Sequence, residues 1–189
     1  MKARLPLEVG PDAAVLPPHP SLARALFALV ERNRERLRRW LPWVEEMRTV
    51  EDEARFLEGS WRAFEAGERL PGVLTVGGRI AGMIGLSIDR ANASAEVGYW
   101  VDGEVEGRGY VSRALARLCD VAFGELRLQR VVILAAVDNA RSRTVAERAG
   151  FRAARLQPGA LQLRGWAIDV VVYELSRSAW ERRRSSKAG

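Results

Sequence analysis

The chain has 189 residues, 48% of them hydrophobic, and its formal net charge of +6 gathers mainly in residues 31–39 and 176–189. This length favours one domain with a sizeable core, and the single cysteine, Cys119, excludes a disulfide framework or a zinc site built from several thiolates. No apolar run could span a membrane or serve as a signal peptide, so we expect a soluble, cytoplasmic α/β or α+β protein without a metal.

The first third of the chain predicts one strand and two helices. Residues 4–9 are predicted to form a short strand. Three prolines within residues 17–20 prevent a helix there, so Ser21 is the expected N-cap of a helix that is broken before Pro42. Thr49, followed by three acidic residues, predicts the start of a second helix, whose apolar residues recur at spacings of three and four.

The middle of the chain changes to the alternating pattern of strands. Residues 72–76 and 79–88 predict a hairpin closed by Gly77-Gly78, because glycine supplies the positive φ that a tight turn needs. Residues 94–101 predict the next strand. A glycine-rich loop then leads into a helix expected over residues 110–126.

The last third predicts three strands around one short helix. Residues 130–137 form a continuous apolar run, which is typical of a strand buried on both faces. A helix is expected over residues 139–149, and residues 151–156 and 168–176 complete the sheet. The element order indicates one domain over residues 1–180, with about seven strands and four helices.

The C-terminal segment 181–189 is basic, and we expect it to be a disordered tail. Only two of the 30 cations in the whole chain are lysines, Lys2 and Lys187. Such a uniform preference for arginine over lysine indicates genome base composition or thermal adaptation. We therefore do not expect direct nucleic-acid binding.

A glycine-rich loop between a strand and a helix contains Gly103, Gly107 and Gly109. Such a loop presents unpaired backbone N–H groups and the positive end of the helix dipole, which together bind phosphate oxygens. The loop lacks both the Lys-Ser/Thr pair of nucleotide-hydrolysing P-loops and the third glycine of the dinucleotide fingerprint. An ordinary tight turn is the alternative interpretation.

A second polar pair follows the buried strand. Asn139 and Ser142 lie three residues apart, so they share one face near a helix N-terminus. Taken alone, Asn139 is equally explained as the N-cap of that helix.

These two segments together resemble a known family. Residues 96–115 (EVGYWVDGEVEGRGYVSRAL) and 137–151 (VDNARSRTVAERAGF) are similar to GNAT acetyltransferases, specifically the branch that acetylates ribosomal-protein N-termini. The segments 40–44 and 168–180 share that resemblance. It implies an α/β GNAT fold with a mixed, mostly antiparallel sheet, acetyl-CoA as donor, and an amine acceptor such as a ribosomal-protein N-terminus. It also implies a homodimer as one form of assembly.

The resemblance also implies residue roles. Trp100 and Val101 would pair with the pantetheine arm through their backbone, and Asn139 and Ser142 would reach the pantetheine and its thiol end, with Ser142 donating to the departing thiolate. The two tryptophans of segment 40–44 would bind the acceptor; they are Trp40 and Trp43. Backbone amides of the loop and helix start would hold the pyrophosphate; they belong to Gly107, Arg108, Gly109, Tyr110, Val111 and Ser112.

The general base is not inherited from the family. The branch carries a glutamate before its last strand, where this chain has only Asp169 nearby. Glu96 is the candidate base and acceptor contact, because strand alternation places it on one face with Ser94 and Trp100. The alternative is that Glu96 merely pairs with an arginine.

Two other functions stay open. A small-molecule amine acetyltransferase would need a closed pocket with acids such as Glu45, Glu46 or Glu96, whereas a protein acceptor needs an open groove near residues 40–44. A non-catalytic module on the same fold would bind acetyl-CoA, or RNA through its tail, without turnover.

Overall fold

The computed structural model describes residues 5–188, in which eight strands form one mixed sheet. All neighbouring strands are antiparallel except β5 and β6, which are parallel, so the predicted mixed and mostly antiparallel α/β fold is confirmed with one strand more than expected. The sheet order is β1-β2-β3-β4-β5-β6-β8-β7. The strands are β1 (Leu7–Glu8), β2 (Ala13–Leu16), β3 (Arg69–Val76), β4 (Arg79–Asp89), β5 (Ser94–Val101), β6 (Arg130–Ala136), β7 (Arg152–Leu163) and β8 (Trp166–Ser176).

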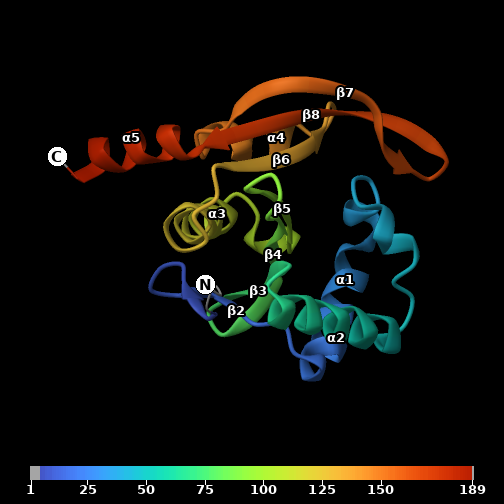
Figure 1. The fold of residues 1–189 in the computed structure, drawn as a ribbon. Coiled ribbons are helices and arrows are strands. Elements are labelled where there is room, and N and C mark those ends of the chain that lie inside the picture. Colours follow the sequence, from blue (N-terminus) through green and yellow to red (C-terminus); the bar gives the residue numbers. More distant parts are fainter. Residues whose placement is uncertain (1–4, 189) are drawn as a thin grey trace.

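Helices cover both faces of the sheet (Figure 1). Buried residues of α3 pack with the odd-numbered residues of β5, such as Val97, whereas α1 and α2 form a second core with Trp100 on the opposite face. Two core clusters on opposite faces therefore fix which side chains of β5 point to which side. The helices are α1 (Ala23–Leu37), α2 (Val50–Ala66), α3 (Tyr110–Asp120), α4 (Ala140–Arg148) and α5 (Arg177–Ala188).

The predicted helix starts are partly correct. The Thr49 hydroxyl accepts a hydrogen bond from the Asp52 N–H at 3.1 Å, and the Asp52 carboxylate accepts one from the Thr49 N–H, which completes a capping box on α2. The prediction for Ser21 was wrong. Ser21 lies inside a 3-10 turn, and its N–H donates to the imidazole of His19, so α1 begins two residues later, at Ala23.

Three segments depart from the expected elements. The extra strand β2 lies between two proline-containing segments and is only four residues long, so it has no alternation long enough to detect. β7 extends to Leu163 because its register with β8 continues past two irregularities. Residues 181–188, expected to be a disordered tail, belong to α5, whose Trp180 packs on Phe123 with ring centroids 5.3 Å apart.

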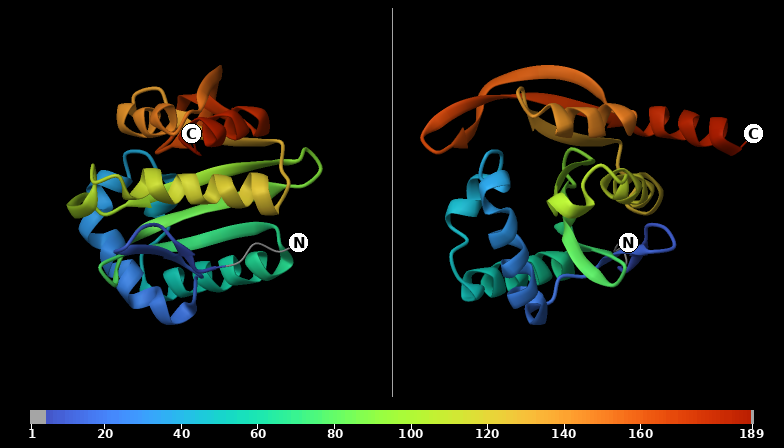
Figure 2. Two further views of the ribbon diagram at one scale, coloured as in Figure 1. Left: turned by 90° about the vertical axis from the view of Figure 1, so that its left-hand side faces the viewer. Right: turned by 180° about the vertical axis from the view of Figure 1, so that it is seen from behind.

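The sheet opens between its two parallel strands. β5 and β6 pair only from Ser94 and Arg130 to Glu96 and Val132, although both strands continue beyond that point. Figure 2 shows β6, β8 and β7 as a layer that separates from the strands β1 to β5. The divergence begins at Glu96, which therefore lies at the closed end of the opening.

Two other expectations concern composition. Within residues 5–188, no helix is long and apolar enough to cross a membrane, and no cluster of three or more potential metal ligands occurs.

Cys119 is buried in the core, and burial raises the pKa of its thiol to about 12. Burial thus disfavours the thiolate form, and Cys119 packs as a small apolar side chain of α3.

Candidate active site

A cavity of about 430 Å³ occupies the opening between β5 and β6. Its walls include residues 96–101 of β5 and 133–136 of β6. In a sheet, alternate backbone groups of a strand face each neighbour, so β5 beyond Glu96 presents N–H and C=O groups to this cavity instead of to β6. An extended ligand arm could pair with that free edge.

The start of α3 adds a row of backbone donors to the same cavity. Its N-cap is Gly109, at φ +79°, and no side chain caps this end, unlike the ends of α2 and α4. The first N–H groups of a helix have no partner within it, and a positive φ is a conformation that glycine adopts without strain. An uncapped helix N-terminus at the cavity wall is suited to hold the oxygens of a phosphate group.

The predicted donor-site residues converge on this cavity with one exception. Arg108 is exposed and does not line it, because it sits between two glycines at the outside of the loop. Trp40, Glu96, Trp100, Val101, Gly107, Gly109, Tyr110, Val111, Ser112, Asn139 and Ser142 all line it.

The start of α4 carries the polar pair. The Asn139 side chain accepts a hydrogen bond from the Ser142 N–H at 3.1 Å, so Asn139 is the helix N-cap, as its alternative interpretation held, and it also lines the cavity. The Ser142 hydroxyl lies 2.9 Å from that of Tyr99 on β5. Burial raises the pKa of the Tyr99 hydroxyl. Tyr99 was not singled out from the sequence, because its partner Ser142 is 43 residues away.

Glu96 lies where the two parallel strands part. Its side chain is accessible from the cavity, and partial desolvation raises the pKa of its carboxyl. Among the described residues, no arginine forms an ion pair with Glu96, and burial is the cause of the shift. The structure therefore does not support the alternative that Glu96 serves only as an ion-pair partner.

A second cavity, of about 310 Å³, lies on the face covered by α1 and α2. Trp43 lines this cavity, with its ring centroid 6.1 Å from that of Trp100. The two predicted acceptor tryptophans thus separate, since Trp40 lines the first cavity and Trp43 the second. Four residues line both cavities, and they are Leu41, Gly98, Tyr99 and Trp100.

Gly98 leaves space at this junction. A Cβ built there would meet nothing within 4 Å, and its backbone has no positive φ. Neither packing nor conformation therefore requires glycine at this position. No side chain stands at this point, where the linings of the two cavities meet.

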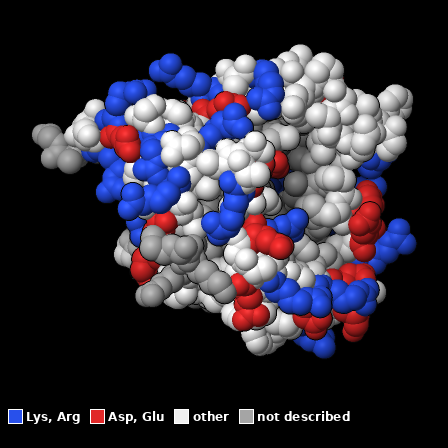
Figure 3. Space-filling model, in the orientation of Figure 1, with Lys and Arg blue, Asp and Glu red and all other residues white. Residues whose placement is uncertain are grey.

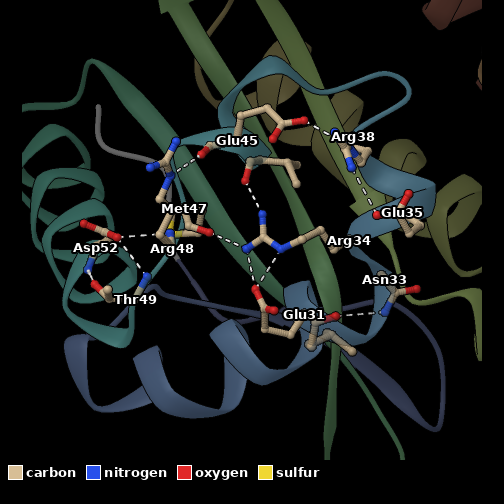
Figure 4. A network of polar contacts seen from close by, with 12 residues as sticks. Glu31, Asn33, Arg34, Glu35, Arg38, Glu45, Met47, Arg48, Thr49 and Asp52 are labelled. Atoms are coloured by element: carbon tan, nitrogen blue, oxygen red, sulfur yellow. Dashed lines mark hydrogen bonds and ion pairs between the residues drawn. The ribbon is translucent and has the colours of Figure 1, made fainter. Parts of the chain in front are cut away.

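The segment that carries Trp40 and Trp43 is held by Arg34 of α1. Figure 4 shows the Arg34 guanidinium pointing into this segment, where it donates to the carbonyl oxygens of Val44 and Met47 and pairs with Glu31. The Arg34 side chain is only 24% exposed. Charge-assisted bonds to two carbonyls fix the segment against α1.

A buried network joins α1 to the glycine-rich loop. Asn33 donates to the Asp102 carboxylate at 3.0 Å and accepts from the Gly103 N–H at 3.0 Å. Arg36 donates to the Val101 carbonyl and forms an ion pair with Glu106 at 3.6 Å. These contacts join α1 directly to the end of β5 and the glycine-rich loop.

Basic side chains gather around the end of the molecule where α5 and α3 lie, while the hairpin end of β7 and β8 is mostly uncharged (Figure 3). Some of these basic side chains contact other residues of the protein. Arg177 pairs with Glu181 at 3.5 Å, and the Arg184 guanidinium lies 4.9 Å from the centroid of the Trp180 ring. The acids Glu45 and Glu46 line neither cavity.

Comparison with known proteins agrees with this geometry. Residues 15–152 match the family model of the acetyltransferase (GNAT) domain. The chain is 37% identical over 170 residues to YdaF of Bacillus subtilis (strain 168), named as a candidate ribosomal N-acetyltransferase, with 86% of this chain and 90% of the relative covered.

Two solved structures share the fold. One is RimL, a ribosomal L7/L12 alpha-N-protein acetyltransferase in complex with coenzyme A, with a TM-score of 0.89, 26% identity, and coverage of 93% of this chain and 99% of that one. The other is the microcin C7 self-immunity acetyltransferase MccE in complex with acetyl-CoA and AMP, with a TM-score of 0.86, 26% identity, and coverage of 90% and 95%.

Proposed function

The chain belongs to the GNAT acetyltransferase family, and we propose that it transfers the acetyl group of acetyl-CoA to the amino group at the N-terminus of a peptide or protein. Acetyl-CoA is the donor substrate of this acyltransferase. The observation that carries the proposal is the meeting of two cavities at Gly98, one beside the uncapped end of α3 and the other on the α1 and α2 face. The peptide acceptor is supported by the names of YdaF and RimL.

The uncapped helix end is the proposed binding site of the pyrophosphate. Backbone amides between Gly107 and Ser112 would donate to its oxygens. The free edge of β5, from Val97 to Val101, would pair with the pantetheine arm. The thioester would then lie between Glu96 and Ser142, since both line the same cavity.

The reaction has a simple balance. The acceptor nitrogen attacks the thioester carbon, a C–N bond forms and the C–S bond breaks, the amine loses a proton, and the sulfur of CoA gains one. Glu96 is the proposed base. Backbone N–H groups of β5 that face the cavity would hold the carbonyl oxygen as charge develops on it. Holding both substrates at the junction would supply up to ~7–11 kcal/mol of the acceleration.

Ser142 is the proposed hydrogen-bond donor to the departing thiolate, which takes up its proton from solvent while the amine proton leaves through Glu96. When the Tyr99 hydroxyl donates to the Ser142 oxygen, the hydrogen of Ser142 is free to point into the cavity. Tyr99 is thus a positioning residue, because it acts through Ser142.

The first test is a calorimetric titration with acetyl-CoA, followed by turnover with peptides and small amines while CoA release and product mass are measured. We expect micromolar binding that weakens in Asn139→Ala, and one acetyl group added at a peptide α-amine. Asn92→Ala, in an exposed turn outside both cavities, is the matched control. Turnover of small amines alone would establish the small-molecule alternative, binding without turnover the non-catalytic one, and no binding at millimolar ligand would overturn the donor site.

A further inference from the structure

A buried carboxyl without a partner lines the second cavity. Glu53, in the first turn of α2, is 2% exposed, and no described residue between 5 and 186 forms a hydrogen bond or ion pair with its side chain. Arg69, the other charged residue of this cavity, does not pair with it. Burial raises the pKa of Glu53 to about 7. Since this carboxyl lines the cavity, a ligand group that donates a hydrogen bond would find an acceptor there.

The walls around Glu53 favour a small group that carries hydrogen-bond donors. Trp43, Met47 and Met83 contribute apolar surface, and Phe56, 42% exposed, lies where the cavity meets solvent. A carboxylate accepts a hydrogen bond from a hydroxyl or an ammonium group, and a tryptophan ring also attracts a cation. The chemistry of this cavity is thus that of a specificity pocket.

Glu53 and Glu96 line different cavities, which share the residue Gly98. Glu96 lines only the first cavity, and Glu53 lines only the second. If the amine reacts at this junction, as the proposed function requires, Glu53 faces a different group of the same acceptor. In a peptide whose α-amine is at the junction, that group is the side chain of the first residue.

We infer that Glu53 is a specificity-determining residue, whose carboxyl binds a hydroxyl or ammonium group on the first side chain of the acceptor. This inference rests on the proposed function. Among the described residues that line the second cavity, Glu53 alone carries a carboxyl group, so the preference for a donor-bearing side chain would depend chiefly on it.

The test measures binding, so it does not depend on turnover. The protein saturated with CoA is titrated with peptides that differ only in their first residue, which is Ser, Thr, Lys, Ala or Val. We expect at least one donor-bearing peptide to bind about tenfold more tightly than the alanine peptide. Glu53→Met, which keeps the side-chain length but removes both oxygens, should abolish that difference.

The matched control is Glu58→Met, an exposed position on the same helix, which should keep the preference. Glu53→Gln, which retains one oxygen acceptor, should keep part of it. The inference is overturned if the unmodified protein does not prefer any donor-bearing peptide over the alanine peptide. It is also overturned if Glu53→Met binds CoA normally and still shows that preference. If no peptide binds at all, the proposed acceptor fails, and the same comparison with serine amide and alanine amide then decides the role of Glu53.

Discussion

The hydroxyl groups of Tyr99 and Ser142 lie 2.9 Å apart, which joins β5 to the start of α4 beside the donor cavity. Tyr99 lies on β5, one of the two strands that part, and Ser142 lies in α4, the helix that follows the other of these strands, β6. The Tyr99 hydroxyl also lies 3.3 Å from the backbone carbonyl oxygen of Ser142, so Tyr99 contacts this residue at two atoms.

Tyr99→Phe tests this relationship. Without the phenol hydroxyl, Ser142 loses the partner that orients it, so kcat should fall by about tenfold, while the affinity for acetyl-CoA changes little. Ser142→Ala should cost a similar factor, and the double variant no more than the larger single effect. Effects that multiply in steady-state kinetics would show that the two hydroxyls act independently.

Glu96→Gln tests the general base. The partial burial that raises the pKa of Glu96 means that its base form is lost as the pH falls through that raised pKa. In the unmodified protein kcat/KM should therefore decrease toward acid pH. The variant should be slower by at least tenfold at neutral pH and should recover partly at high pH, where the acceptor amine deprotonates by itself. An identical pH–rate profile for both proteins would contradict this assignment.

Most of the residues predicted for the donor side line one cavity, and the sequence was sufficient for this grouping. Residues 96–115 are contiguous, and the chemistry of a loop at a helix start depends on backbone groups that any glycine-rich loop presents. Arg108 was assigned with its neighbours because spacing cannot show which residue of a loop turns outward. The helical tail was missed because its anchor, Trp180, packs on Phe123, a residue 57 positions earlier in the chain.

The acceptor side could not be predicted in the same way. Glu51, Asp52 and Glu53 look alike in the sequence as acids at a helix start, and only the packing of α2 buries the third of them. Similarly, Trp40 and Trp43 are three residues apart, yet they line different cavities. Such distinctions arise from tertiary packing, which periodicity does not report.

Glu53 should make the stability of the protein depend on pH. Its pKa is about 7 in the folded protein against an ordinary value of 4.5, so the folded state binds the extra proton between these two values. The free energy of unfolding should therefore decrease as the pH rises from 4.5 through 7, by at most about 3 kcal/mol.

Glu53→Gln should remove this loss of stability at high pH, because the amide does not ionise. The stability gained over the unmodified protein should be small at pH 5 and should grow at pH 8, as urea unfolding at both pH values can measure. Glu58→Gln, at an exposed position, should show no such trend. A gain for Glu53→Gln that is equal at both pH values would mean that Glu53 titrates normally.

Arg34→Met tests how the tryptophan segment is held. The change leaves the carbonyl oxygens of Val44 and Met47 without their donor, which should cost about 1–3 kcal/mol of stability. Because Trp43 then loses its fixed position, the KM for the acceptor should rise more than the Kd for acetyl-CoA. Arg38→Met removes only ion pairs to Glu35 and Glu45 and should change KM little. Equal effects of the two substitutions would contradict the role of Arg34.

Gly98→Ala tests whether the acceptor reaches the donor through the junction of the two cavities. The added Cβ meets no atom within 4 Å, so the variant should fold and should be as stable as the unmodified protein or slightly more so. The methyl group narrows this junction, and kcat/KM for the acceptor should fall by about tenfold while acetyl-CoA binding stays within twofold. Gly59→Ala, which also meets open space but lies on α2 outside both cavities, controls for the loss of backbone freedom. If Gly98→Ala acetylates its acceptor as fast as Gly59→Ala does, the amine enters the donor cavity by another route.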